Sequence, residues 1–125
     1  MGTNAKRFDR WIRSYVRAWR TDDAHAIGAL FSPRAVYATG PFDRLWRGRA
    51  RIVAEWVARG DSRVKWSFRH KVVAADGATC VIEGRTTYAA SKGRPRRVYG
   101  NLWIVRLNAR GEADEFREWF MPKPK

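Results

Sequence analysis

The spacing of hydrophobic residues changes once along the chain, from a helical period in the first half to strict alternation in the second. Apolar residues within 8–20 fall on one stripe at helical spacing with arginines outside it, which predicts an amphipathic helix with Asn4 as a candidate N-cap. A second helix is expected over 24–31, ended by the Ser-Pro pair that follows it, and a third over 49–59.

The second half of the chain has the pattern of strands with one buried face. Asp76-Gly77 is a strong hairpin signal, and Gly111 suits a turn that needs a positive φ. The predicted strands are a short one over 35–39 and four long ones over 64–72, 79–88, 98–107 and 113–121.

Three helices and one short strand, followed by four long antiparallel strands, predict an α+β fold of the cystatin-like roll type. We expect the helices to cover one face of a cone-shaped, strongly curved antiparallel sheet and to leave a hole in the cone. The chain is short enough for a single domain over 1–125, with an ordered core at about 6–121 and short basic tails.

The last two predicted strands carry polar side chains among large rings. By alternation, one face holds Tyr99, Asn101, Trp103 and Val105 of one strand and Asp114, Phe116, Glu118 and Phe120 of the other. An amide and a carboxylate are of no use to a purely apolar core. This face is therefore predicted to be the floor of a binding pocket.

Three segments carry a resemblance to a known family: "YVRAWRTDDAHAIGALFSPRAVYATGPF", "WRGRARIVAEW" and "NLWIVRLNARGEADEFREWF". They resemble the nuclear-transport-factor-2-like superfamily, and within it the SnoaL-like polyketide cyclases and the ketosteroid isomerases. The resemblance covers nearly the whole chain and implies the fold. It does not imply one activity, because this fold hosts isomerases, dehydratases, epoxide hydrolases, cyclases and non-catalytic binders.

The resemblance also suggests roles for single residues. The oxyanion-donating tyrosine of ketosteroid isomerases corresponds to Tyr15, whereas their general-base aspartate falls at Ala38 and their second donor, a protonated acid, falls at Trp103. Two of the three functional groups are missing, so steroid isomerisation by that mechanism is not expected. The same correspondence points Phe116 and Glu118 into the pocket.

Glu118 is the candidate acid or base. A carboxylate among Trp103 and Phe116 would be desolvated, which raises its pKa toward the range useful for proton transfer. The alternative is a structural ion pair between Glu118 and an arginine such as Arg85 or Arg106.

The other candidates also have structural alternatives. Tyr15 is a hydrogen-bond donor to the ligand or a core tyrosine, and Asn101 orients a ligand or holds Glu118 or a loop in place. His70 lies on the apolar side of its predicted strand, where a core or interface role competes with ligand contact. The predicted ligand-binding residues are Trp19, Tyr37, Trp46, Trp56, Trp103, Phe116 and His70.

No His, Cys, Asp or Glu spacing resembles a metal site and there is no Gly-rich phosphate loop, so we expect neither metal nor cofactor. Cys80 is the only cysteine, which excludes an internal disulfide. With no apolar signal-peptide core or membrane-length apolar run, we expect a cytoplasmic protein.

The formal net charge of +14 raises the alternative of a basic module that binds nucleic acid or an acidic partner. Basic residues cluster at 44–51 and at 92–97. We also expect a homodimer, because a second apolar sheet face, with Trp66 and Phe68 on it, would otherwise be exposed to water.

The favoured function is a pocket for a small apolar or aromatic ligand that contains a carbonyl group. If the protein is catalytic, we expect a cofactor-free isomerase, cyclase or lyase that acts by proton transfer, with Glu118 as acid/base and Tyr15 and Asn101 as donors. A non-catalytic ligand-binding protein with the same pocket is the alternative.

Overall fold

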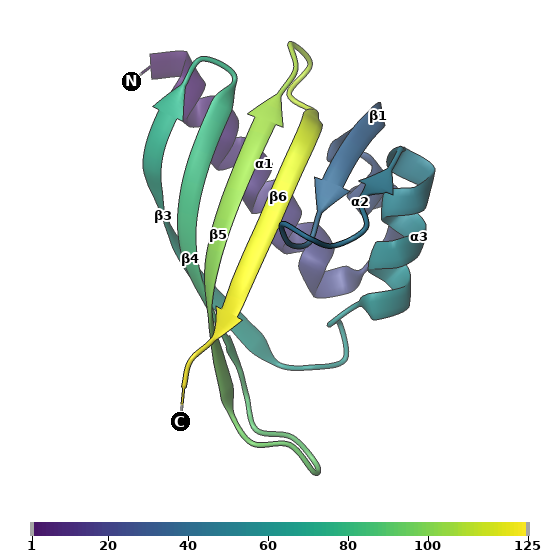
Figure 1. Cartoon of the computed structure of the whole chain (residues 1–125), viewed down its shortest axis with the longest axis vertical. Helices are drawn as coiled ribbons and strands as arrows, with labels where there is room; N and C mark the ends of the chain where they lie inside the picture. The colour runs from purple at the N-terminus through teal and green to yellow at the C-terminus, as the bar shows by residue number, and fades with distance from the viewer. Residues whose placement is uncertain (1, 125) are drawn as a thin grey trace.

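The computed structural model describes residues 2–124, with side chains from residue 5 onward. The first helix begins at Gly2, so Asn4 lies inside it and its prediction as the N-cap is wrong. Three helices and six strands make up the fold (Figure 1). In chain order they are α1 (Gly2–Thr21), α2 (Ala24–Gly28), β1 (Phe31–Ala38), β2 (Trp46–Arg47), α3 (Arg49–Arg59), β3 (Trp66–Asp76), β4 (Thr79–Tyr88), β5 (Arg97–Leu107) and β6 (Ala113–Pro122).

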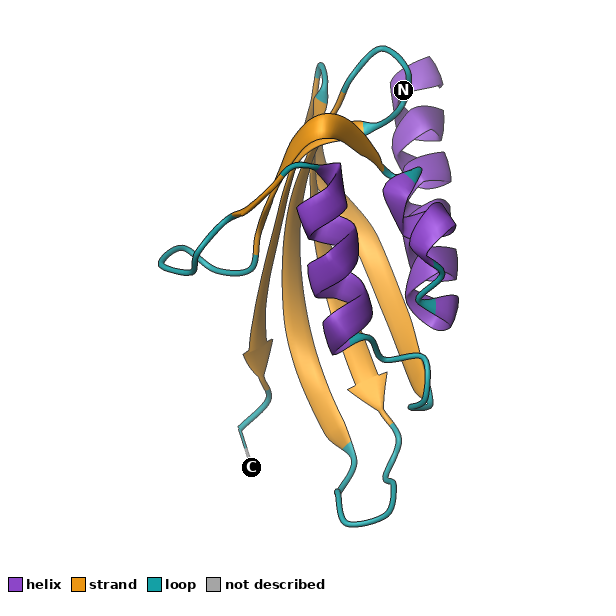
Figure 2. Cartoon of the chain, turned by 90° about the vertical axis from the view of Figure 1, so that its right-hand side faces the viewer, coloured by secondary structure: helices purple, strands orange, loops and turns teal. Residues whose placement is uncertain are grey.

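The strands form one curved sheet in the order β2-β1-β6-β5-β4-β3. Neighbouring strands are antiparallel except β1 and β6, which run parallel. α1 crosses behind the long strands in Figure 1, and Figure 2 shows the strands bending around α3. The predicted α+β roll with a curved sheet under three helices is thereby confirmed, with β2 as an additional short strand.

The core lies between α1 and the inner face of the sheet. α1 buries Trp11, Tyr15 and Trp19 at a spacing of four residues, which keeps them on one side of the helix. Tyr15 packs against Trp103 of β5 and Phe116 of β6, with ring centroids 4.5 and 5.1 Å apart. Burying each such ring stabilises the fold by about 1.5–3 kcal/mol, so this aromatic layer holds α1 on the sheet.

The second predicted helix ends early, because β1 begins at Phe31 and takes in the Ser-Pro pair that was expected to end the helix. Parallel pairing with β6 draws this segment into the sheet, and the backbone N–H of Ala113 donates to the carbonyl oxygen of Leu30 at 2.8 Å. The register shifts between Phe31 and Val36, the interval that contains Pro33, whose nitrogen cannot donate to a ladder.

Trp66 and Phe68 lie on the inner face of the sheet, so their predicted place on the opposite face is wrong. Trp66 stacks on Trp19 at 3.8 Å and Phe68 stacks on Trp103 at 4.8 Å, both within the single chain. Alternation along β3 puts both rings on one face, and α1 covers that face.

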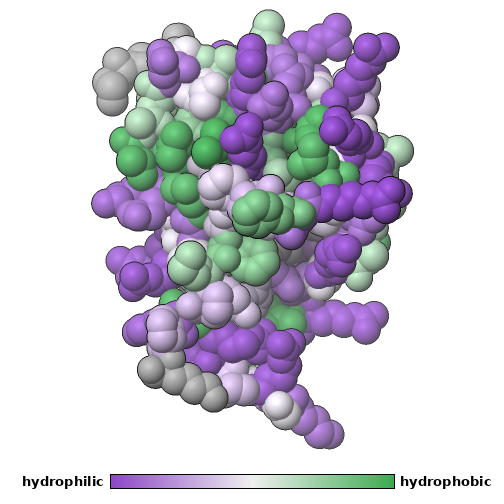
Figure 3. Space-filling view, in the orientation of Figure 1, coloured by the Kyte–Doolittle hydropathy of each residue, from purple (hydrophilic) through white to green (hydrophobic). Residues whose placement is uncertain are grey.

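The outer sheet face, which is turned toward the viewer in Figure 3, mixes apolar and charged side chains. Leu102 of β5 pairs with Trp119 of β6, and Met121 follows two residues later, with Leu102 37% and Met121 74% exposed. Arg69 and Arg85 border this area on β3 and β4. None of the helices described over 2–124 is long and apolar enough to span a membrane.

Candidate functional site

A cavity of about 760 Å³ lies between the sheet and the helices. Tyr88, Arg97 and Phe120 of its lining come from the end of the molecule where β4 and β6 finish and β5 begins, at the bottom in Figure 1, and this end is called the mouth below. The rings that line the cavity come from the helices α1 and α3 and from every strand except β3: Tyr15, Trp19, Tyr37, Trp46, Trp56, Tyr88, Tyr99 and Phe120. Such an aromatic lining is typical of sites for small organic ligands.

A chain of hydrogen bonds joins three residues of the cavity wall. The Tyr37 hydroxyl donates to Oε1 of Glu118 at 2.9 Å, and the hydroxyls of Tyr15 and Tyr37 are 2.8 Å apart. Because Tyr37 donates to the carboxylate, Tyr15 donates to Tyr37. The chain connects α1, β1 and β6, three elements that are far apart in the sequence.

The register of β5 and β6 places Glu118 on the inner face. Glu118 lies opposite Trp103, and Phe116 lies opposite Val105. The pairing shifts between Arg106 and Leu107, so buried Ala113 takes the place on this face that simple alternation assigned to Asp114.

Burial raises the pKa of the Glu118 carboxyl, and the negative charge of Asp61 raises it further. Hydrogen bonding from Tyr37 and the nearby Trp103 indole N–H act in the opposite direction. The Trp103 Nε1 is buried and has no partner with full hydrogen-bond geometry among the described residues. Glu118 is therefore a stronger base than a carboxylate in water.

Both tyrosines of the chain remain protonated donors. Burial raises the pKa of the Tyr15 and Tyr37 hydroxyls well above 10, and the charge of Glu118 raises both further. Both hydroxyls therefore keep their protons at neutral pH. Glu118 is then the one group of the three hydrogen-bonded residues that can exchange a proton with a ligand.

Asn101 forms a second polar pair in the cavity. The hydroxyl of Thr86 on β4 donates to Oδ1 of Asn101 on β5 at 2.8 Å, and both residues are buried while still lining the cavity. The Asn101 amide oxygen is occupied by this bond, which leaves the Nδ2 hydrogens available to a ligand oxygen. Its partner is Thr86, so Asn101 does not hold Glu118 in place.

Asp61 is a cavity residue that the sequence pattern missed. It follows α3 and accepts hydrogen bonds from Nε1 of Trp19 at 3.0 Å and from the hydroxyl of Tyr88 at 2.7 Å. In the sequence it directly follows Gly60, the residue after α3. An acidic residue beside a glycine was the only signal for it, and that signal is too common to single out a site.

Asp22, which follows α1, also binds the loop that follows α3. It accepts from Nε1 of Trp56 at 3.0 Å and from the backbone N–H of Ser62 at 2.8 Å, while Asp23 caps α2. A Cβ atom on Gly60 would lie 2.0 Å from an oxygen of Asp22, so a larger residue there would displace the Asp22 carboxylate. The two aspartates fix the loop that carries Asp61.

The structure brings together Glu118, Tyr15 and Asn101, and the cavity is also lined by the predicted wall residues Trp19, Tyr37, Trp46 and Trp56. Trp103 and Phe116 are completely buried beneath the floor instead of lining the cavity.

His70, a predicted ligand contact, is exposed and is not part of the lining of this cavity. Its ring stacks on Phe68 at 5.6 Å, and Phe68 in turn stacks on Trp103. Phe68 therefore separates His70 from the cavity.

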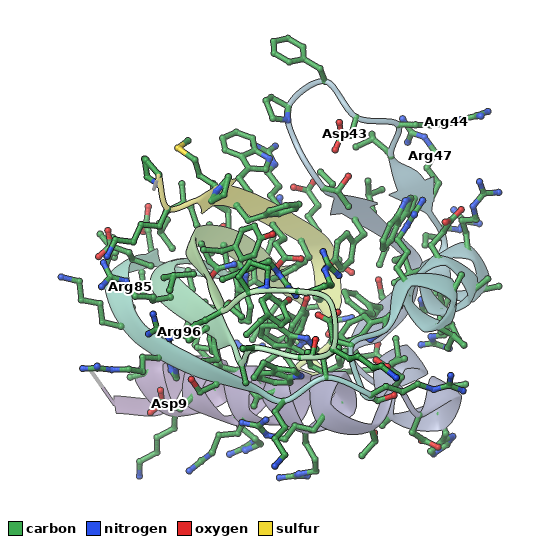
Figure 4. All side chains as sticks on the ribbon, turned by 90° about the horizontal axis from the view of Figure 1, so that it is seen from below. Asp9, Asp43, Arg44, Arg47, Arg85 and Arg96 are labelled. Atoms are coloured by element: carbon green, nitrogen blue, oxygen red, sulfur yellow. The ribbon has the colours of Figure 1, made fainter. Side chains whose placement is uncertain are left out.

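The predicted alternative of an ion pair for Glu118 is not found. Arg85 and Arg106 are exposed, and Figure 4 shows Arg85 pointing away from the space between the sheet and α1. Within the described side chains, no arginine or lysine nitrogen lies within 4.0 Å of the Glu118 carboxylate. No group of three His, Cys, Asp or Glu side chains suited to a metal ion occurs in this part of the chain either.

Residues 12–116 match the sequence profile of the SnoaL-like domain. The chain belongs to the SnoaL-like family. A search among curated proteins finds no match. Solved structures with the same fold are also found.

Three such structures are similar over most of their length. SalBIII, an epoxide hydrolase/cyclase-like enzyme of pyran ring formation in the polyether salinomycin, has a TM-score of 0.77 at 18% identity over 97% of this chain and 95% of its own. A ketosteroid isomerase-like protein from Erwinia carotovora atroseptica gives 0.71 at 15% identity over 99% of this chain and 100% of its own. An LEH-like epoxide hydrolase of M. tuberculosis gives 0.64 at 20% identity over 90% and 80%. At these identities the similarity shows the fold alone.

Proposed function

We propose that this SnoaL-like protein binds a small, largely aromatic carbonyl compound and transfers a proton on it without a cofactor. The observation that carries the proposal is the Tyr15–Tyr37–Glu118 chain, which ends in a carboxyl of raised pKa at the wall of an aromatic cavity. A desolvated carboxylate that no cation neutralises is costly to stability, and a role in acid–base chemistry accounts for it.

The geometry supports separate roles for the polar residues. Glu118 takes a proton from the carbon next to the ligand carbonyl, and the negative charge that develops on the carbonyl oxygen receives a hydrogen bond from Nδ2 of Asn101. The proton on Glu118 then returns to another carbon or leaves with a departing group, which corresponds to isomerisation or elimination. Tyr37 orients the carboxylate and Tyr15 orients Tyr37, so both are positioning residues instead of direct donors to the ligand.

A ligand-binding protein without turnover would use the same cavity and is the second candidate. The third, polyanion binding, loses support in the 44–51 cluster. Arg49 donates to the carbonyl oxygen of Phe31 and pairs with Glu112, and Arg51 pairs with Glu55, so half of that cluster is engaged within the fold.

The test uses 2-tetralone, an aromatic ketone whose α-protons exchange with solvent deuterium. Proton NMR in D₂O measures the exchange rate with the wild-type protein, with E118Q and with E115Q, a matched change at an exposed glutamate on the same strand. A general base typically contributes about 10²–10⁴ in rate, so E118Q should lose about 100-fold of the protein-dependent exchange.

Binding is measured in parallel by saturation transfer from protein to ketone. Retained binding with lost exchange in E118Q supports the proton-transfer role. Binding without any exchange above the buffer rate in the wild type would reject catalysis on simple ketones and favour the non-catalytic candidate.

A further inference from the structure

Five arginines line the cavity or its mouth, and they differ in how they are neutralised. Arg51 and Arg59 both pair with Glu55, at 2.9 and 3.2 Å. Arg44, Arg94 and Arg97 also line the cavity, and no carboxylate oxygen lies within 4.0 Å of their nitrogens among the side chains of residues 5–124.

Arg94 lies in the connection between β4 and β5, which is held in shape at its tip, and Arg97 is the first residue of β5. The backbone groups of Ser91 and Arg94 exchange two hydrogen bonds of 2.9 and 3.0 Å, with Gly93 at a φ of +80° closing the turn. The guanidinium of Arg97 lies 5.0 Å from the ring centroid of Tyr88, a cation–π contact at the cavity wall. Both arginines thus stand at the mouth on a defined backbone.

The acidic residues of the lining are already used elsewhere. Asp43 accepts from Thr39 at 2.7 Å, on the loop that Figure 4 shows with Arg44 outside the helices and sheet. Asp61 accepts from Trp19 and Tyr88, and Glu118 lies at the inner end with Tyr37. The lining holds five arginines and four carboxylates, and none of these carboxylates lies within 4.0 Å of a nitrogen of Arg94 or Arg97. The net charge of +14 adds to the positive potential around these two arginines.

We propose that the ligand of this cavity is an organic acid whose aromatic body occupies the cavity and whose carboxylate is bound at the mouth by Arg94 and Arg97. This inference rests on the proposed function and names its substrate class. A guanidinium presents parallel N–H donors that match the two oxygens of a carboxylate, and its stacking on Tyr88 holds that fork in place. The reacting carbonyl then lies toward Glu118 at the opposite end from the carboxylate.

The size and lining of the cavity agree with a ligand of two parts. A volume of about 760 Å³ exceeds what a single ring fills, and pockets of roughly 300–1,000 Å³ bind molecules with both an apolar body and polar substituents. An uncharged ligand would leave the arginines of the mouth in water, whereas an anionic one uses them.

The experiment is a competition against N-phenyl-1-naphthylamine, an uncharged probe that fluoresces in apolar cavities. 1-Naphthylacetate and its methyl ester, which have the same aromatic body, each displace the probe from wild-type protein, from R94Q/R97Q and from R10Q/R13Q. The last is the matched control, because Arg10 and Arg13 are exposed on α1 away from the cavity and the change in net charge is the same.

We expect the acid to displace the probe at a concentration about tenfold lower than the ester in wild type and in R10Q/R13Q, and this preference to disappear in R94Q/R97Q. Equal displacement by acid and ester in the wild type would overturn the anion assignment while leaving the pocket in place. Equal loss of the preference in both double variants would assign it to net charge and overturn the role of the two arginines. Failure of the probe and of both competitors to bind, checked by calorimetry, would overturn the pocket and the anion site together.

Discussion

Replacement of Glu118 by glutamine separates a functional carboxylate from a structural one. The substitution keeps the shape of the side chain and an oxygen that can accept the Tyr37 hydrogen bond, while it removes the charge and replaces the other oxygen by an NH₂ group. Because burial and the charge of Asp61 raise the pKa of this carboxyl, its ionised form is destabilised in the folded protein. E118Q should therefore be as stable as the wild type or more stable at neutral pH.

The expected gain in stability of E118Q follows from the raised pKa of Glu118. Each unit by which folding raises a carboxyl pKa corresponds to about 1.4 kcal/mol of stability lost once the group ionises in the fold. For a domain of this length, 1 kcal/mol corresponds to roughly 4 °C in Tm. Recovery of about 1 kcal/mol by E118Q would thus raise the Tm by about 4 °C at pH 7.

The difference in Tm between E118Q and the wild type depends on pH, whereas a purely structural effect of the substitution would not. Because the pKa of Glu118 is higher in the folded protein, folding favours the protonated carboxyl. The protonated carboxyl stabilises the fold fully below the unfolded pKa of about 4.5, and this stabilisation is lost as the pH rises through the folded pKa. The Tm of wild type should match that of E118Q near pH 4 and fall below it with rising pH.

Circular dichroism melts between pH 4 and 8 measure this difference, with E115Q as the exposed-glutamate control that should not reproduce it. A fall in Tm of about 5 °C or more for E118Q at pH 7 would refute the reasoning, because it would show that the ionised carboxylate stabilises the fold. Glu118 would then be a structural residue.

Four further predictions concern other parts of the molecule. Y37F removes the donor to Glu118 and should cost about 1 kcal/mol in urea unfolding and move the pH profile of ketone exchange upward, and an unchanged profile would contradict the hydrogen-bond chain. D61N weakens the bonds from α1 and β4 and should lower the free energy of unfolding by about 1–3 kcal/mol, so wild-type urea stability would contradict its clamping role. Burial raises the pKa of the Cys80 thiol to about 11, so iodoacetamide at pH 8 should label it only after unfolding, and rapid labelling of the folded protein would contradict its burial. Trp66 and Phe68 are covered within the chain, so the predicted homodimer now rests on the exposed Leu102 and Met121 of the outer sheet face. Sedimentation should show a dimer that dissociates in M121E, whereas a wild-type monomer at tens of micromolar would reject it.

Local patterns were sufficient for most of the elements. The third helix and the second long strand were predicted with the boundaries that α3 and β4 have, because periodicity and flanking glycines are properties of a few adjacent residues. β1 was predicted too short and β2 was missed, because both depend on pairing partners elsewhere: β1 with β6, and β2 with Val36 and Tyr37. Tertiary pairing there places Ser32 and Pro33 inside a strand, where the local pattern predicted only the end of a helix.

The residues of the site were mostly predicted, whereas the hydrogen bonds between them were not. Alternation and the family resemblance pointed Glu118, Asn101 and Tyr15 toward one cavity, where the structure places them. Alternation alone cannot say which face of a strand a helix covers, and Trp66 was accordingly assigned to the wrong face. The role of Asp61 depends on donors from two distant elements, which no local pattern contains.

The central claim is that Glu118 acts as the base on a ligand held in the aromatic cavity, and the pH profile of 2-tetralone exchange tests it most directly. The protein-dependent rate should rise with pH through one titration, at a pKa above the ordinary carboxyl value of 4.5, and then level off. That titration should be absent in E118Q and unchanged in E115Q. A wild-type rate that only follows the buffer, or an identical titration in E118Q, would contradict the account.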